Sequence, residues 1–419
     1  MPEEVVVTGV GVVSPLGSQP AFWRRLCAGE SGVAPVAGAD TAAPPPRLEA
    51  RARGWSVRDH VRTPLLRRMD RCSQMIVSAC RMALADAALA LEGSAAEAAG
   101  MVLGTAFGNL SESEAFLRGL FAKGPALANP LTFPNLVLNA PAGYAAIDLG
   151  LRGPNLTVVR GEASGEAALA QAYDTIVTGQ ADVLLAGGGD ELAPVLRAIY
   201  SDAGLLSPDD GGKEWTSPFD RRRNGFVMGE GAAVMVLESG HHAAARGARV
   251  LAEFAGHVEE SLAASPHDWP RPEAARDAAA SRRGLAALGF PPPRAAGALL
   301  AVSCANSTAR LDATDATRLA AILGPEVART LVTSLKGAVG EWGAAGALGA
   351  VAAVLALATG DVPRLGELGA PDPACTPGPG GGLRLADLRT PAPPAGFAAA
   401  LVSATPRGGG ALTLLFRRP

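Results

Sequence analysis

Short apolar runs alternate with longer amphipathic segments along the chain. Most of these runs are too short for a helix and rich in β-branched residues, which predicts strands buried on both faces. Arg71–Leu91 instead places Cys72, Ile76, Ala79 and Ala83 at helical spacing and predicts an amphipathic helix. The predicted strands of the first part of the chain are Glu4–Val13, Met101–Ala106, Leu156–Arg160, Val183–Gly187 and Ala232–Leu237.

The same alternation returns after about residue 245. The predicted strands of this second part are Val250–His257, Ala298–Ser303, Thr330–Ser334, Ala399–Val402 and Leu412–Phe416. Continuous apolar strands separated by helices predict an α/β fold with a parallel sheet covered on both faces. Because the second part repeats the theme of the first, we expect two similar halves, residues 1–245 and 246–419.

The longest charge-free apolar run extends from Gly343 to Gly360. Its length of about 18 residues is borderline for a membrane span. The run consists largely of Ala and Gly, however, and such weak hydrophobicity favours a helix buried inside the protein. We therefore expect this segment to lie between two strands and expect no membrane partner.

Charge and cysteine usage narrow the classes of function. The net charge of −3 and the pI near 6.0 argue against a nucleic-acid binder. The acidic N-terminus leads directly into a strand, with no visible signal peptide. The cysteines form no CxxC pair, which argues against disulfides and a metal site and favours a reducing cytoplasm. They are Cys27, Cys72, Cys80, Cys304 and Cys375.

Two glycine motifs suggest chemistry that their context does not support. Gly9-Val-Gly11 follows a strand, as in a dinucleotide-binding loop, but Ser14 replaces the next expected glycine and Pro15 blocks the start of a helix. Gly161-Glu-Ala-Ser-Gly165 is close to the nucleophile turn of hydrolases, but its serine comes one position late. We expect no cofactor, and we expect this serine to begin a helix.

A series of longer motifs resembles β-ketoacyl-acyl carrier protein synthases. The motifs occur in family order over nearly the whole chain, which makes the resemblance specific. It implies a thiolase-type duplicated five-layer α-β-α-β-α fold, built from two stacked β-α-β-α-β-α-β-β halves. The motifs include Gly153-Pro-Asn-Leu-Thr157, Gly161-Glu-Ala-Ser-Gly165, Ala181-Asp-Val-Leu-Leu-Ala-Gly-Gly188, Ser217-Pro-Phe-Asp220, Asn224-Gly-Phe-Val-Met-Gly-Glu-Gly231 and Gly343-Ala-Ala-Gly346.

The resemblance locates the family's catalytic positions, and none of them keeps its residue. The nucleophilic cysteine of the A-C-A-S-G motif is replaced by Glu162. The first histidine, of H-G-T-G-T-P-L-G-D, falls on Cys304 when the segment is anchored at Asp312. The second, of K-x-x-x-G-H-x-x-G-A-A-G, falls on Glu341 or Gly340, depending on the end from which this shorter segment is counted.

Other positions near the site are expected to be structural. These are Lys336, Asp312, Asp315 and Glu230. The family's C-terminal G-F-G-G-T-N loop is changed to Pro406-Arg-Gly-Gly-Gly-Ala411 and lacks its phenylalanine.

Decarboxylative condensation requires a thiolate to carry the acyl chain and donors, usually two imidazoles, to stabilise the enolate. A carboxylate is a poor nucleophile, and none of the five histidines lies in a matching motif. Glu162 is either a charge tolerated at a helix N-terminus or a carboxylate that fills the vacated oxyanion pocket. Cys304 is either a spare thiol or a small buried hydrophobic residue. We expect no catalytic residue.

This pattern is similar to the chain-length factors of type II polyketide synthases, which retain the fold but replace the cysteine, typically by Gln. The resemblance implies a heterodimer with an active ketosynthase, a role in shaping the acyl tunnel, and contact with acyl carrier protein. Phe133, Asn135 and Asn139 would lie in the loop that reaches across the dimer, or would only order that loop. Arg62, Arg67, Arg68 and Arg71, or Arg221–Arg223, would meet the carrier, or would be solvated or paired within the chain.

Two catalytic alternatives remain open at this point. The first is a malonyl-acyl carrier protein decarboxylase that primes chains using Glu162. The second is a condensing enzyme with a rearranged site that uses Cys304.

Overall fold

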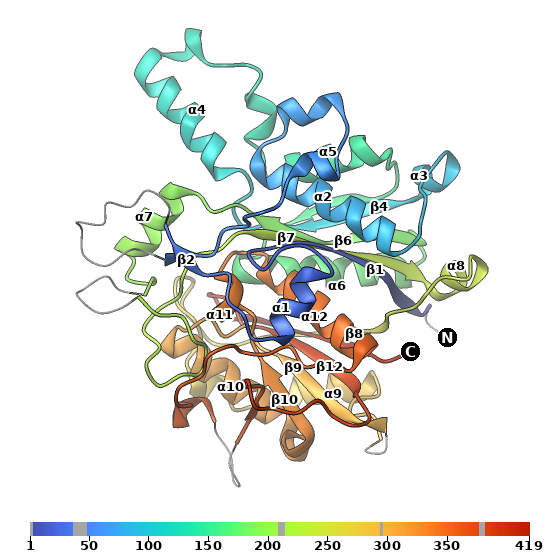
Figure 1. The fold of residues 1–419 in the computed structure, drawn as a ribbon, viewed down its shortest axis with the longest axis vertical. Helices are drawn as coiled ribbons and strands as arrows, with labels where there is room; N and C mark the ends of the chain where they lie inside the picture. Colours follow the sequence, from blue (N-terminus) through green and yellow to red (C-terminus); the bar gives the residue numbers. More distant parts are fainter. Residues whose placement is uncertain (1–2, 37–47, 208–213, 294–295, 377–381) are drawn as a thin grey trace.

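The computed structural model describes residues 3–36, 48–207, 214–293, 296–376 and 382–419 (Figure 1). Within them, an eleven-stranded sheet has the order β11-β10-β9-β12-β13-β8-β1-β7-β6-β4-β5, and β2 pairs with β3 separately. The strands are β1 (Val5–Val13), β2 (Ala34–Pro35), β3 (Leu48–Glu49), β4 (Gly100–Gly104), β5 (Asn155–Val158), β6 (Val183–Asp190), β7 (Gly231–Ser239), β8 (Ala252–Ser261), β9 (Ala298–Val302), β10 (Thr330–Thr333), β11 (Arg384–Leu385), β12 (Phe397–Ala404) and β13 (Gly410–Arg417). Each predicted strand is present.

The sheet consists of two sets of strands with the same topology. The first set has the order β5-β4-β6-β7-β1, and the second repeats it as β10-β9-β12-β13-β8, with β11 added at the edge. The sets meet where β1 pairs with β8, over Val6–Glu253 and Val7–Ala252. The predicted duplication of the fold is therefore confirmed, whereas the boundary near residue 245 stays a prediction.

The prediction of a parallel sheet is correct only in part, because the sheet is mixed: β4–β5, β4–β6, β9–β10 and β9–β12 are parallel pairs. In each set one strand, β7 or β13, runs antiparallel to both of its neighbours. For β13 the reason is local: only the short loop Thr405–Gly409 separates it from β12. Adjacent strands joined by so short a connection can pair only in the antiparallel sense.

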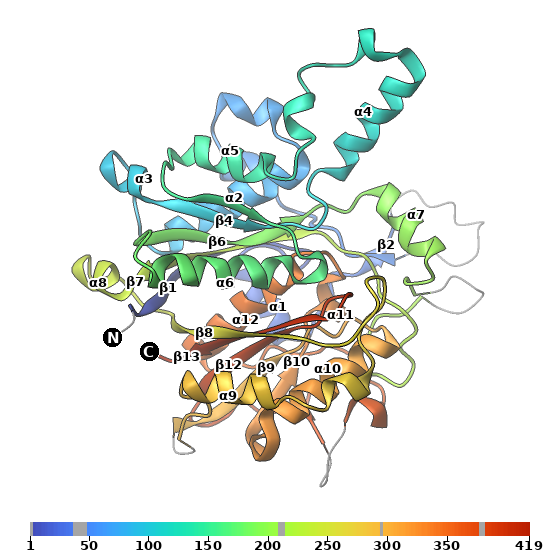
Figure 2. The same ribbon diagram turned by 180° about the vertical axis from the view of Figure 1, so that it is seen from behind.

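The helices divide the two sets of strands into layers. In Figures 1 and 2, α6 and α12 lie between the sets, α2 and α5 cover the outer face of the first set, and α9 and α10 cover that of the second. This is the expected five-layer arrangement. The helices are α1 (Ala21–Cys27), α2 (Arg71–Asp86), α3 (Ser94–Ala98), α4 (Leu110–Lys123), α5 (Ala140–Leu149), α6 (Ser164–Val177), α7 (Pro194–Asp202), α8 (Gly240–Ala245), α9 (Ala279–Ala287), α10 (Ala309–Leu323), α11 (Lys336–Val339) and α12 (Ala345–Thr359).

Helix α12 is the apolar Ala/Gly-rich segment, and it is buried along almost its whole length. A helix that is apolar on all sides packs in the middle of a protein. Among the described helices, none combines the length and the apolar character that crossing a bilayer requires. Small residues let α12 approach α6 closely: a Cβ added at Gly165 would lie 2.5 Å from the Ala344 carbonyl oxygen and 2.7 Å from Ala347 N.

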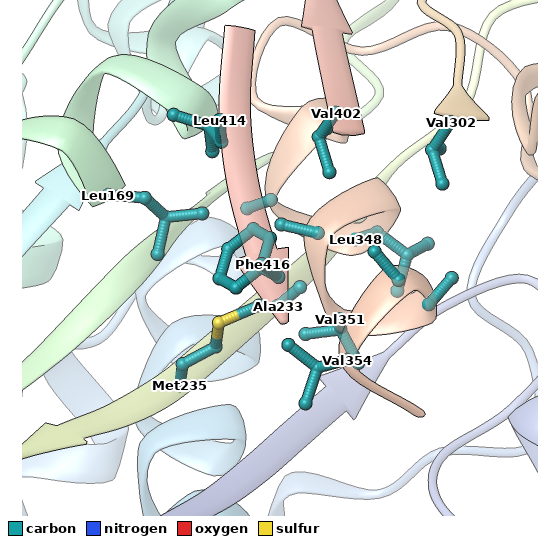
Figure 3. Packing of buried hydrophobic residues seen from close by; sticks show 14 of the residues in the cluster. Leu169, Ala233, Met235, Val302, Leu348, Val351, Val354, Val402, Leu414 and Phe416 are labelled. Atoms are coloured by element: carbon teal, nitrogen blue, oxygen red, sulfur yellow. The ribbon is translucent and has the colours of Figure 1, made fainter. Parts of the chain in front are cut away.

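Side chains from both halves pack on α12 in one continuous core (Figure 3). Its members include Leu348, Val351 and Val354 of α12, Leu414 and Phe416 of β13, Val402 of β12, Val302 of β9, Ala233 and Met235 of β7, and Leu169 of α6. This packing fixes α6 and α12 relative to one another, and the N-terminal ends of these two helices carry the candidate site.

Candidate functional site

Glu162 lies at the N-terminal tip of α6, in the 3₁₀ turn Gly161–Ala163. Gly161 has a φ of +55°, a left-handed conformation that glycine adopts without strain. The Ser164 hydroxyl accepts from Arg160 N at 2.9 Å and donates to the Gly161 carbonyl at 2.7 Å, which fixes the turn and begins the helix. The Glu162 side chain is only 11% exposed.

Arg407 binds the carboxylate of Glu162 from the opposite half of the fold. Its Nε donates to Glu162 Oε1 at 2.6 Å, and its backbone N donates to Oε2 at 3.3 Å. The guanidinium carbon lies 5.5 Å from the ring centre of Tyr200 and 5.6 Å from that of Trp269. Burial alone would lower the pKa of Arg407, but attraction to Glu162 outweighs it and raises that pKa. The pair is therefore an ion pair held between two aromatic rings.

A second ion pair lies beside the start of α12. Lys336 Nζ donates to Glu341 Oε2 at 2.8 Å, and Asn306 Nδ2 donates to the same oxygen at 2.7 Å. Burial would lower the pKa of Lys336, but the charge of Glu341 raises it, so the lysine stays charged. Burial raises the pKa of Glu341, and Lys336 opposes this change. Both side chains are about 95% buried.

The structure distinguishes the two positions considered for the second histidine. Gly340 has a φ of +72°, and a Cβ added there would lie 2.7 Å from Gly229 N. Gly340 therefore forms a tight turn against the backbone of Gly229 in the same chain, while Glu341 lines the same cavity as Glu162. Of the two, Glu341 is the residue that the fold brings to the centre.

The cavity between these charged groups is nearly filled. It leaves about 10 Å³ for the centre of a water molecule, which is room for about one water. Its lining comes from both halves of the fold and includes Phe107, Glu162, Asp190, Tyr200, Glu341 and Trp342.

The sequence of this chain matches two family models of known proteins. Residues 2–243 match the family model of the beta-ketoacyl synthase N-terminal domain, and residues 251–368 match that of the C-terminal domain. This chain belongs to the beta-ketoacyl synthase family. A 3-oxoacyl-[acyl-carrier-protein] synthase 2 of Synechocystis is 30% identical over 381 residues, which are 89% of this chain and 90% of that enzyme.

Other relatives match over a shorter stretch. The Staphylococcus aureus (strain N315) enzyme of the same name is 33% identical over 259 residues, which are 61% of this chain and 62% of the relative. Three similar solved structures match over the full length of this chain and of their own. They are the ishigamide ketosynthase/chain length factor (TM-score 0.86, 27% identity), a type II ketosynthase in complex with acyl-carrier protein (0.84, 25%) and a beta-ketoacyl synthase of Burkholderia phymatum (0.84, 28%).

Cys304, which was predicted to fall at the first histidine position, is 5% exposed and packs in an apolar cluster with Tyr200, Phe226 and Trp269. Burial raises the pKa of its thiol well above the ordinary value, and Asp315 adds to this effect. The thiol is therefore protonated at neutral pH, whereas a nucleophile needs the thiolate. The geometry fits a small buried hydrophobic residue better than a spare nucleophile.

The four positions expected to be structural all organise loops or ion pairs. Asp312 accepts from the backbone N of Phe219 and of Asn306, at 2.9 Å each, and its burial raises its pKa to about 7. Asp315 accepts from Ser403 Oγ at 2.6 Å.

Glu230 accepts from Arg71 Nε at 3.0 Å and from Ala52 N at 3.0 Å. The other arginine cluster is partly paired as well, since Arg223 Nη1 donates to Asp372 at 2.5 Å.

The three residues predicted to contact a partner differ in their exposure. Asn135 is buried within its own chain, where its Nδ2 donates to the Arg68 carbonyl at 2.7 Å and its Oδ1 accepts from Tyr144 at 2.6 Å. Asn135 therefore orders the loop. Phe133 is 64% exposed and Asn139 is also exposed. A contact of these two with a partner stays a prediction.

Five residues at or near the site were not predicted from the sequence: Arg407, Tyr200, Trp269, Asn306 and Glu166, a carboxylate buried behind the cavity. One signal was available: a buried Glu162 needs a cation, and Arg407 is the one charged residue of an otherwise Gly-rich loop. None of the five histidines lines this cavity. His241 and His257 pair with carboxylates near the surface, and His242 pairs with the buried Glu238. Among the described residues, no group of three or more His, Cys, Asp or Glu is placed to hold a metal ion.

Proposed function

We propose that this chain is a non-catalytic ketosynthase-like subunit that pairs with an active ketosynthase, as a chain-length factor does. The observation that carries the proposal is the Glu162–Arg407 pair, which occupies the place expected for the nucleophilic cysteine. The proposal concerns this chain's own centre and its partners, because membership of the family by itself leaves the catalytic status open.

The chemistry of the centre supports a non-catalytic role. Attack by Glu162 on a thioester would require its carboxylate to leave Arg407 and would give a labile anhydride. The lysine and amide beside it, Lys336 and Asn306, are both engaged by Glu341. Among the described residues, no imidazole faces the cavity to stabilise an enolate. The same arrangement argues against decarboxylation through Glu162 and against condensation through Cys304.

The partner surface is proposed at the β5 edge of the sheet. Among the described strands, none pairs with the outer side of β5. Its Leu156 is 42% exposed, and Val159, just after the strand, is 52% exposed. Helix α4, which extends away from the body (Figure 1), has no buried residue, and its Phe121 is 83% exposed. An open strand edge beside exposed apolar side chains is suited to extending one sheet into a second subunit.

A second surface is suited to an acidic carrier protein. Arg58, Arg62 and Arg67 are exposed around one groove, and Arg68 is exposed next to Arg67 in the sequence. Within the described part of the chain, these arginines pair with no carboxylate. Unpaired cations raise the local concentration of an acidic partner. A similar structure is described as a ketosynthase in complex with acyl-carrier protein, which supports this assignment.

Co-purification and an activity assay test the proposal together. The tagged chain is co-expressed with a ketosynthase that has an intact Cys-His-His set, and separately purified alone. We expect a stable complex that condenses malonyl units on acyl carrier protein. We expect the chain alone to release no carbon dioxide from malonyl-carrier protein and to acquire no acyl group by mass spectrometry.

Elongation by the chain alone would refute the non-catalytic assignment. Carbon dioxide release that disappears in Glu162→Ala would instead favour a decarboxylase. Acylation found on Cys304 would favour a rearranged condensing enzyme. Failure of the complex to form would refute the pairing.

A further inference from the structure

Two loops are joined into one cover above the candidate site. The first is Thr405–Gly409, between β12 and β13, and the second is residues 262–271, after β8. Gly408 N donates to the Asp268 carbonyl at 3.1 Å, and Leu262 N donates to the Gly409 carbonyl at 2.7 Å. We call these two segments the lid.

The lid is attached to α6 through Arg407. Gly408 and Gly409 have φ values of +80° and +86° and offer no side chain for anchoring. The base of the loop is held separately, because Thr405 Oγ1 donates to Asp315 at 3.1 Å. Among the described residues, Arg407 therefore links the lid to the tip of α6 through its ion pair with Glu162.

Trp269 connects this attachment to the second loop of the lid. Its ring lies 5.6 Å from the Arg407 guanidinium, and Tyr200 of α7 faces the same group at 5.5 Å. Cys304 belongs to the apolar cluster that contains both rings. Opening the lid would therefore move Trp269 away from this cluster and expose the Cys304 thiol that packs in it.

We propose that the Glu162–Arg407 ion pair is a latch that keeps the lid closed over this chain's own centre and so excludes an acyl chain from it. In this arrangement the residue in the nucleophile position holds a loop from the other half of the fold. The latch concerns closure of this chain alone, so it does not depend on which partner the chain binds.

Thiol labelling of Cys304 tests the latch. The purified chain, alone or in its complex, is treated with N-ethylmaleimide, and each cysteine is followed by peptide mass spectrometry. We expect Arg407→Ala and Glu162→Ala each to speed labelling of Cys304 by about ten-fold or more, because each removes one member of a largely buried pair. The double variant should be no faster than either single variant, since the two residues act as one contact.

Matched controls distinguish opening of the lid from general loosening of the fold. Cys72 and Cys80 on α2 are fully buried and report general loosening of the fold. Arg152→Ala removes an exposed ion pair with Glu97 and should leave Cys304 unchanged. Glu162→Gln has the same shape without the charge, so it keeps the test valid if the Ala variants fold poorly, and it should still speed the labelling.

Two results would overturn the latch. One is an unchanged Cys304 rate in Arg407→Ala and Glu162→Gln. The other is parallel acceleration at Cys72 and Cys80, which would make the pair a general support of the fold. Exchange of the two charges, in Glu162→Arg with Arg407→Glu, should return the rate toward that of the unmodified protein.

Discussion

Glu166 provides a test of the electrostatics of the centre. It lies in the first turn of α6, fully buried against α12, where a Cβ added at Gly346 would come within 1.8 Å of its carboxyl carbon. Its Oε2 has no hydrogen-bond partner among the described residues. Burial raises the pKa of Glu166 from 4.5 to about 7. The charge of Lys336 opposes this change, while Glu341 adds to it.

This shift makes stability depend on pH in a defined direction. The folded protein holds the Glu166 proton more tightly than the unfolded chain, so the stabilisation is complete below pH 4.5 and is lost as the pH rises to about 7. At about 1.4 kcal/mol for each pH unit, the whole interval corresponds to about 3 kcal/mol. Glu166→Gln, which is neutral and has the same shape, should abolish this loss.

We therefore expect Glu166→Gln to be about 3 kcal/mol more stable than the unmodified protein at pH 8, relative to their difference at pH 4.5. Urea unfolding midpoints measured from pH 4.5 to 8 give this difference. Asp312, whose pKa is raised to about 7, and Asp190, whose pKa is raised to about 6, titrate in the same range. They are present in both proteins, so their contribution cancels.

A matched control is Glu92→Gln, since Glu92 is exposed. It should shift the midpoint equally little at every pH. A stability difference for Glu166→Gln that stays constant between pH 4.5 and 8 would refute the argument. It would mean that Glu166 is charged, and satisfied by its surroundings, throughout this range.

Three further changes test other parts of the structure. Lys336→Met should destabilise the fold by about 3–5 kcal/mol in urea unfolding, because it leaves Glu341 buried without its cation; additional replacement of Glu341 by Leu should recover part of this loss. Glu162→Cys should give a thiol that iodoacetamide alkylates but no condensation by the chain alone, and a 3-ketoacyl product would contradict this. Leu156→Asp should weaken ketosynthase binding at least about ten-fold in calorimetry, while Leu388→Asp, at a leucine that is 51% exposed, should not.

Much of the fold could be predicted because most of its longer strands, such as β1, β6, β7 and β12, are buried on both faces. Such strands appear in the sequence as continuous apolar runs, and each predicted run is a strand. The direction of each strand was harder to predict from the sequence, since it depends on which strands become neighbours in the sheet. The Gly-rich turn before β13 was a local signal for a hairpin, whereas the 40 residues between β6 and β7 gave no such signal. The Asp86 end of α2 also came earlier than the predicted Leu91.

The site could be predicted only in part, for a physical reason. Motif order predicted Glu162, Cys304 and either Glu341 or Gly340 for the catalytic positions, because each prediction follows from local sequence. Arg407 lies 245 residues from Glu162, and only the packing of the two halves brings them together. The volume of the cavity and the burial of Glu166 likewise depend on side chains from several elements, so neither can be predicted from a local sequence pattern.

The two ion pairs explain why a single substitution should not return this centre to condensing chemistry. A carboxylate at position 162 without Arg407 would be a largely buried, uncompensated charge, and Glu341 without Lys336 would be the same. Each acid is therefore stabilised in the fold together with its cation. A thiol placed at 162 would still lie beside Arg407 and the Lys336–Glu341 pair, and no imidazole lines the cavity to assist it. In the proposed non-catalytic role, condensing chemistry would therefore require replacement of both pairs, and not only the return of the missing sulfur.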